Sequence, residues 1–180
     1  MDSQLSGRVL LLAGLFFSTT VMPMPRQNVE VASLINERLS YMKDVAGYKA
    51  NNHLAIEDLR QEIKVLSSSV VEAEKLGLEG ESVKPFIQAQ MDAAKAIQYR
   101  YRADWLSVPE NGWQPEPLEQ VRSKISILST EILRDVSTRL TKGDLLTDKT
   151  AFIKELNQAH LKDSDKERLW SSIKQITLKK

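Results

Sequence analysis

The amino-acid sequence predicts an all-α fold, a single-domain bundle of about six helices, three of them long. Apolar residues recur at three- and four-residue spacing along most of the chain, which is the period of an amphipathic helix. The 180 residues include only 7 Gly and 6 Pro, too few turn formers for a fold of many short strands. A hydrophobic fraction of 42% at this length is enough to bury one core without covalent staples.

The first three predicted helices are bounded by capping residues and breaks. The first begins with Asn28 as its N-cap and continues to a break predicted at residues 51–52. The second covers about 56–76 and stops at Gly77, because glycine accepts the left-handed conformation that often ends a helix. The third covers 82–105 and begins with a capping serine.

The rest of the chain adds one long helix and two short ones. A proline-rich connector over 109–117 separates the third helix from a fourth, which covers about 118–140. Two shorter helices, near 149–159 and 164–177, finish the chain.

Residues 1–25 differ in character from the rest. Arg8 precedes an apolar run over 9–17, and small polar residues follow it. This order is typical of a secretory signal peptide, and the run is too short to span a membrane as a helix. We therefore expect export to the periplasm or the medium, cleavage between residues 20 and 30, and no membrane contact of the mature chain. A buried amphipathic helix is the alternative.

Charge and cysteine content exclude several classes of function. The 25 Lys+Arg balance 24 Asp+Glu, whereas a nucleic-acid binder carries a basic excess, so we expect no nucleic-acid partner. The absence of cysteine rules out disulfides, thiol nucleophiles and cysteine metal sites. With only two histidines, we expect no metal site.

Polar residues that fall on apolar helix faces are the candidates for function. Arg38 lies three residues after Ile35 and four before Met42, so it shares their face. Lys49 follows Arg38 by roughly 16 Å along a continuous helix and would share that face too. Gln98 falls in the middle of the apolar face of the third helix.

Two further helices carry such charges. On the second helix, Asp58 and Glu62 are four residues apart and therefore lie on one side. On the fourth helix, Arg122 shares a face with Leu118 and Ile125.

Each of these residues also fits a structural interpretation. Arg38 and Lys49 could extend along the edge of a helix interface, with their charges in water. Glu62 could form an ion pair with Arg38 or Arg60, and Gln98 could be a satisfied core amide. Other charges are interpreted as ordinary surface groups, namely Lys64, Lys95, Arg100 and Arg102.

The combination of these residues favours a binding site. Several polar groups on different helices are costly to bury unless they satisfy one another or a ligand. The set is mainly cationic and includes neither a nucleophile–base pair nor a metal cluster, so it would suit a small anion with carboxylates and hydroxyls. Any chemistry there would rest on orientation and charge stabilisation.

Three stretches carry a family resemblance, namely Leu34–Lys49, Ile56–Glu62 and Phe86–Trp105. In this order they resemble the helices of the all-helical (AroQ class) chorismate mutases, in particular the secreted gamma subclass. The resemblance covers about residues 30–125, whereas 126–180 matches only in being helical and in length.

The resemblance implies an isomerase that rearranges chorismate to prephenate within one molecule, a step of phenylalanine and tyrosine biosynthesis. Such an enzyme needs no cofactor, no metal and no covalent intermediate. It implies a catalytic domain over 26–180, with the site in 30–125 and a helical extension over 126–180.

The resemblance also implies a role for each matching position. Lys49 and Gln98 would be catalytic, because both would donate to the ether oxygen whose bond breaks. Arg38 would bind a substrate carboxylate, and Lys49 would contact one as well.

Three more positions match residues that bind substrate. Glu62 would hold the ring hydroxyl, with Asp58 nearby. Arg122 matches an arginine that intracellular relatives borrow from a second protomer, so each site would lie inside one chain even in a homodimer.

Two positions depart from the family pattern. The family usually has arginine at the place of Gln61, while here Arg60 stands one residue earlier. One residue is about 100° around a helix, so the substrate-binding role is left shared between Arg60 and Gln61. Ala94 replaces a serine or threonine of some relatives.

Two other classes of function remain open on the sequence. A non-enzymatic exported helical binding or adaptor protein would use the same charges as interhelical ion pairs. A chaperone-like amphipathic bundle would expose an apolar stripe instead.

Overall fold

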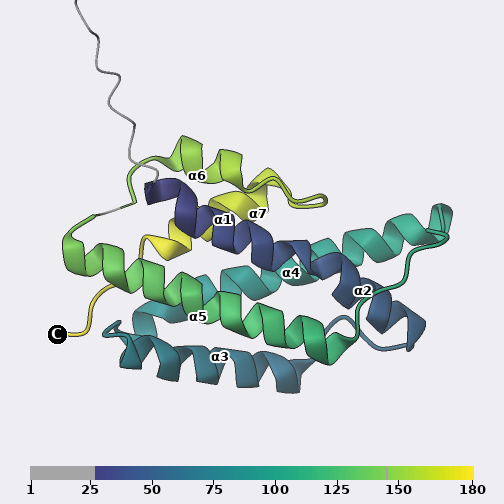
Figure 1. Ribbon diagram of the computed structural model, residues 1–180, viewed down its shortest axis with the longest axis horizontal. Helices are drawn as coiled ribbons and strands as arrows, with labels where there is room; N and C mark the ends of the chain where they lie inside the picture. The colour runs from purple at the N-terminus through teal and green to yellow at the C-terminus, as the bar shows by residue number, and fades with distance from the viewer. Residues whose placement is uncertain (1–26, 145) are drawn as a thin grey trace, which may run out of the picture.

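The computed structural model describes residues 27–144 and 146–180 (Figure 1). The predicted signal peptide over 1–25 lies outside the described residues. The described part contains seven helices, namely α1 (Gln27–Ser40), α2 (Met42–Asn51), α3 (Leu59–Lys75), α4 (Gly80–Ser107), α5 (Leu118–Lys142), α6 (Lys149–Glu155) and α7 (Asp163–Ile173).

The all-α prediction is confirmed, and the first predicted helix is divided in two. A single residue, Tyr41, separates α1 from α2, and Val45 N still donates to Tyr41 O at 3.1 Å. Counted as one interrupted rod, α1 and α2 leave the six helices that the sequence predicts. The rod ends where predicted, beside Asn52.

Several helix boundaries differ from the predictions, two of them because other residues act as caps. Helix α3 begins at Leu59, since Asp58 caps it by accepting from Gln61 N at 3.1 Å. Helix α4 begins at Gly80, because the Glu79 carboxylate accepts from the N–H of Ser82 at 2.6 Å. The short α6 ends at Glu155 instead of continuing to about 159, and α7 ends at Ile173 instead of 177.

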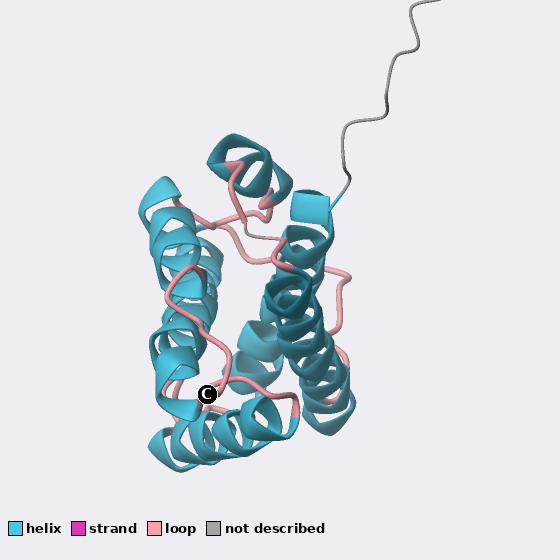
Figure 2. Cartoon of the chain, turned by 90° about the vertical axis from the view of Figure 1, so that its left-hand side faces the viewer, coloured by secondary structure: helices cyan, strands magenta, loops and turns pink. Residues whose placement is uncertain are grey.

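Helices α4 and α5 are the two long helices on which most of the other elements pack. Helix α4 contacts α2, α3 and α7, while α5 contacts α1, α2 and α3 (Figure 1). The short α6 packs on α1 and α7. Figure 2 shows the same helices from one end, with only loops joining them in the part of the chain that is described. Helices α1 to α5 thus enclose a common interior.

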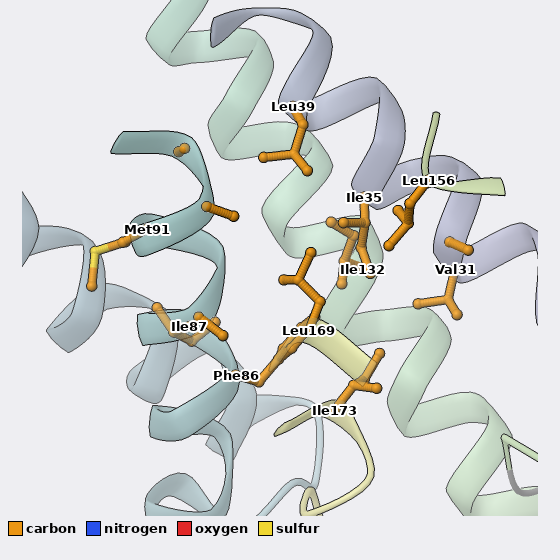
Figure 3. Close-up of a cluster of buried hydrophobic side chains, with 14 of the residues drawn as sticks. Val31, Ile35, Leu39, Phe86, Ile87, Met91, Ile132, Leu156, Leu169 and Ile173 are labelled. Atoms are coloured by element: carbon orange, nitrogen blue, oxygen red, sulfur yellow. The ribbon is translucent and has the colours of Figure 1, made fainter. Parts of the chain in front are cut away.

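The core lies where α1, α4, α5 and α7 meet (Figure 3). Ile35 of α1, Phe86 of α4, Ile132 of α5 and Leu169 of α7 are all fully buried. The C-terminal part of the chain therefore contributes side chains to the core and does not merely cover it. Each such side chain stabilises the fold by about 1.5–3 kcal/mol relative to exposure.

The connector between α4 and α5 is anchored on α2. The Trp113 ring lies so close to Gly47 that a Cβ there would be 2.6 Å from it. Lys43 Nζ lies 4.6 Å from the centre of the same ring, and Glu116 N donates to Asp44 Oδ1 at 3.0 Å. These contacts fix the start of α5.

None of the helices in the described residues is both long and apolar enough to cross a membrane.

Candidate active site

Five helices and the loop before α3 surround a cavity of about 130 Å³, which has room for a small molecule instead of a single water. Eight polar side chains line it, namely Arg38, Lys49, Asp58, Gln61, Glu62, Lys95, Gln98 and Arg122. The apolar wall consists of Met42, Val45, Ile56, Val65, Met91, Ala94, Leu118 and Ile125. Seven of the eight candidate site residues from the sequence therefore line one cavity.

Arg38 enters the cavity from α1 and is only 6% exposed. Its Nε donates to Ser129 Oγ at 3.0 Å, and that hydroxyl donates to Ile125 O at 2.7 Å, which fixes the guanidinium. Its Nη1 is buried and has no hydrogen-bond partner among the described residues. Burial lowers the pKa of Arg38 to about 10. Ser129 lies beyond residue 125, so the C-terminal segment also supports the site.

Lys49 enters from α2 and is 7% exposed. Its Nζ donates to Ile56 O at 2.5 Å, in the loop before α3. Burial lowers the pKa of Lys49, and the positive charge of Arg122 adds to that effect, while Asp58 and Glu62 oppose it. Two further ammonium hydrogens remain available to a ligand.

Gln98 enters from α4 and is almost fully buried. Its Nε2 donates to Ala94 O at 3.1 Å, and the only other acceptor among the described residues is Met42 Sδ at 3.7 Å, a weak one. A ligand oxygen could replace the thioether contact. Its Oε1 is buried without a partner.

Glu62 pairs with a residue that the sequence interpretation missed. Its Oε2 accepts from Lys95 Nζ at 2.9 Å, and its Oε1 is buried without a partner. The predicted surface position of Lys95 is therefore wrong, and neither Arg38 nor Arg60 is the partner of Glu62. The signal available in the sequence was the position of Lys95 one residue after Ala94 and three before Gln98, both of which face the cavity.

Arg122 lies at the start of α5, opposite the N-cap of α3. Its Nη2 is 3.5 Å from Asp58 Oδ2, and its Nη1 donates to Glu119 Oε1 at 3.1 Å. Both partners are substantially exposed, so this ion pair is weak and can be exchanged for a ligand.

Gln61 and Arg60, between which the substrate-binding role is shared on the sequence, border different spaces in the structure. Gln61 lines the cavity, whereas Arg60 is exposed and lies in an open neighbouring groove with Lys49, Asp58 and Arg122. Arg60 therefore does not line the enclosed cavity, although the groove it borders shares Lys49, Asp58 and Arg122 with that cavity.

The charges of the cavity leave space for a dianion. Four cations face two carboxylates, and those carboxylates pair with Lys95 and Arg122. Within the described residues, neither Arg38 nor Lys49 has a carboxylate at ion-pair distance. Three of the four buried polar side-chain atoms without a partner in this part of the chain also lie here. Such atoms are costly unless a ligand satisfies them.

No group of His, Asp or Glu in the described residues is arranged to hold a metal ion.

The fold and the site define an all-helical protein with an enclosed, mainly cationic cavity of a size that suits a small molecule. The family model described as chorismate mutase type II matches residues 26–99. A secreted chorismate mutase of Yersinia pestis is 52% identical over 96% of this chain and 93% of its own length. A monofunctional chorismate mutase of Enterobacter agglomerans is 42% identical over 93% of this chain and 94% of its own length.

Solved structures agree with these sequence relatives. The crystal structure of the secreted chorismate mutase from Yersinia pestis has a TM-score of 0.80 and 56% identity, and the match covers 83% of this chain and 98% of that one. A chorismate mutase structure from Burkholderia thailandensis, at 18% identity and a TM-score of 0.67, shares the fold. The chain therefore belongs to the type II chorismate mutase family, as the resemblance predicted, and is an isomerase. The comparisons do not favour an adaptor or binding protein.

Proposed function

We propose that the cavity binds chorismate as a dianion and accelerates its rearrangement to prephenate. The observation that carries this proposal is the pair of buried cations, Arg38 and Lys49, that have no carboxylate partner in the described residues. A ligand with two carboxylates would supply what they lack. An adaptor protein would leave these charges and their unpartnered neighbours without a role.

The two carboxylates of the substrate would bind to two different arginines. Arg38 would offer its free Nη1 to one carboxylate, and Arg122 would exchange its exposed partner Asp58 for the other. Glu62 would accept the ring hydroxyl with its free Oε1. Holding the substrate at three points favours the compact conformer in which the reacting carbons approach each other.

Lys49 and Gln98 would stabilise the transition state. The ether oxygen gains negative charge only as its bond breaks, so donors fixed in advance at that oxygen lower the barrier and not the ground state. Lys49 is anchored by Ile56 O and Gln98 by Ala94 O, so both are held in place before the substrate arrives. Neither needs a cofactor to act.

The roles of Gln61 and Arg60, and the separate sites of a homodimer, are inferred from where these residues and the cavity lie. Gln61 would add polarity but no charge to the wall, while Arg60 would attract the dianion into the open groove. Because the cavity is lined from within one chain, a homodimer would carry two separate sites.

Export is part of the proposal. We propose that residues 1–25 direct the chain to the periplasm or the medium and are removed, which leaves a domain over 26–180. The secreted relative from Yersinia pestis supports this. N-terminal sequencing of the protein from periplasmic and culture fractions would give the compartment and the cleavage point together.

The direct test adds chorismate to the purified protein and follows the loss of its absorbance, with prephenate identified as the product. A bicyclic diacid that resembles the transition state should raise the melting temperature by mass action. Absence of both responses in correctly folded protein would reject the function.

A further inference from the structure

Lys95 lies in the cavity wall, where it is paired with carboxylates. It comes from α4, between Ala94 and Gln98, and its side chain is 23% exposed. Its Nζ is 2.9 Å from Glu62 Oε2 and 3.6 Å from Asp92 Oδ1. With two carboxylates around it, Lys95 is matched in charge, unlike Arg38 and Lys49.

The contact with Lys95 determines which oxygen of Glu62 is free. Because the ammonium holds Oε2, only Oε1 remains as an acceptor, and this atom is buried without a partner. The hydrogen bond to Glu62 outweighs burial and raises the pKa of Lys95, so the ammonium stays charged at neutral pH. Without this contact, nothing among the described residues would fix which oxygen of Glu62 faces the cavity.

Lys95 is itself held by a chain of polar contacts that reaches α7. Asp92 accepts from Gln88 Nε2 at 2.9 Å and from Arg168 Nη2 at 2.8 Å. The C-terminal segment therefore contacts the cavity wall through Arg168, Asp92, Lys95 and Glu62 in turn. Arg168 is 60% exposed, so its link contributes less than the contact between Lys95 and Glu62.

We propose that Lys95 is a positioning residue that orients Glu62 toward the substrate's ring hydroxyl and so sets the preference for a hydroxylated ring. This inference rests on the proposed function. The hydroxyl is not part of the bond that breaks, so its contact stabilises the bound substrate and the transition state about equally. Loss of such uniform binding raises KM and leaves kcat nearly unchanged.

The experiment compares Lys95→Met with Lys95→Arg and with Lys64→Met, an exposed lysine on α3 that serves as the matched control. We expect Lys95→Met to raise KM about tenfold, the size typical of a hydrogen bond to a charged group, with kcat within about twofold. Lys95→Arg should recover most of the affinity, and Lys64→Met should match the parent protein.

Two competitive inhibitors, a ring-hydroxylated diacid and its deoxy counterpart, give the specificity directly. The parent protein should prefer the hydroxylated compound about tenfold, and Lys95→Met should lose most of that preference. In a double variant with Glu62→Gln, the second change should add little, because both act on one contact.

The outcomes separate this inference from the proposed function. Parent protein that leaves chorismate unchanged rejects the function itself. An active parent combined with an unchanged KM and an unchanged inhibitor preference in Lys95→Met rejects the positioning role alone. A fall in kcat with the preference intact also rejects it, because Lys95 would then act on the reacting atoms.

Discussion

Two buried arginines in this molecule have opposite surroundings. Arg38 and Arg139 are 6% and 5% exposed, and each borders a cavity. Arg139 is surrounded by carboxylates, with Asp135 at 2.6 Å, Asp144 at 3.2 Å and Glu30 at 3.9 Å. Arg38 has one neutral partner, Ser129 Oγ, and a free Nη1.

The difference separates a structural charge from a charge kept for a ligand. A buried cation needs its counter-charge, and carboxylates among the described residues supply it to Arg139 but not to Arg38. Cavity size alone would not distinguish them, because the cavity beside Arg139 is the larger, at about 170 Å³ against 130 Å³. What distinguishes the candidate active site is the positive charge around its cavity that no carboxylate among the described residues matches.

The largest loss of activity should come from substitution of Lys49, the other buried cation without a carboxylate partner in the described residues. We expect Lys49→Ala to lower kcat by about 10²–10³, or roughly 3–4 kcal/mol, because it removes a donor that acts at the transition state. The melting temperature should not fall, since a desolvated charge is removed. Steady-state kinetics and thermal unfolding of one preparation check both. Near-normal turnover would mean that a buried cation without a carboxylate partner does not mark the active site.

The contrast between the two arginines can be tested by the same substitution at each. Arg139→Met leaves carboxylates crowded together and should lower the free energy of unfolding by about 2–3 kcal/mol, less than a fully buried pair because Glu30 is exposed. Its kcat/KM per folded molecule should stay unchanged.

Arg38→Met should give the reverse pattern. We expect kcat/KM to fall roughly 100-fold, which corresponds to an activation barrier raised by about 2–3 kcal/mol. The free energy of unfolding should stay unchanged or rise. Denaturant titration and kinetics on both variants are sufficient. If Arg38→Met unfolds as readily as Arg139→Met, Arg38 is structural and the contrast fails.

A smaller, pH-dependent effect is expected at Gln98. An amide donates at any ordinary pH, whereas a carboxyl donates only when protonated. Gln98→Glu should therefore lose about tenfold in kcat at pH 8 and recover at pH 5, while the parent stays nearly flat between them. The measurement is kcat against pH at saturating chorismate. Parallel profiles would mean that Gln98 does not touch the ether oxygen.

The positions of the site residues could be predicted where a polar residue interrupts an apolar helix face. Arg38, Lys49 and Gln98 stood out in this way, and the structure brings them to one cavity. That these three residues line one cavity depends on how five helices pack against one another. The hydrophobic periodicity of the sequence does not predict this packing. The break at Tyr41 was not visible, because it interrupts the helix at one residue only.

Lys95 and Ser129 were missed for a physical reason. A lysine beside the edge of an apolar stripe looks the same whether its charge meets water or a carboxylate on another helix. Glu62 approaches Lys95 only through the packing of α3 on α4, and Ser129 approaches Arg38 only through α5 on α1. One sequence can place Lys95 beside positions that face the cavity, but it does not show that Glu62 lies opposite.

The smallest expected effect is an alkaline limb in kcat/KM. A lysine is charged below its pKa, and burial lowers that of Lys49 from the ordinary 10.5, so the charge is lost at a lower pH than on a surface lysine. Arg38, with a pKa of about 10, adds to the same fall. Since kcat/KM reports the free enzyme, its limb should begin below pH 10.5, while that of kcat begins higher because bound carboxylates restore the charge. Rate profiles from pH 7 to 10.5, with circular dichroism at each pH to exclude unfolding, decide this. Coincident limbs for kcat and kcat/KM would mean that no substrate carboxylate reaches these cations, and the distinction from Arg139 would lose its functional meaning.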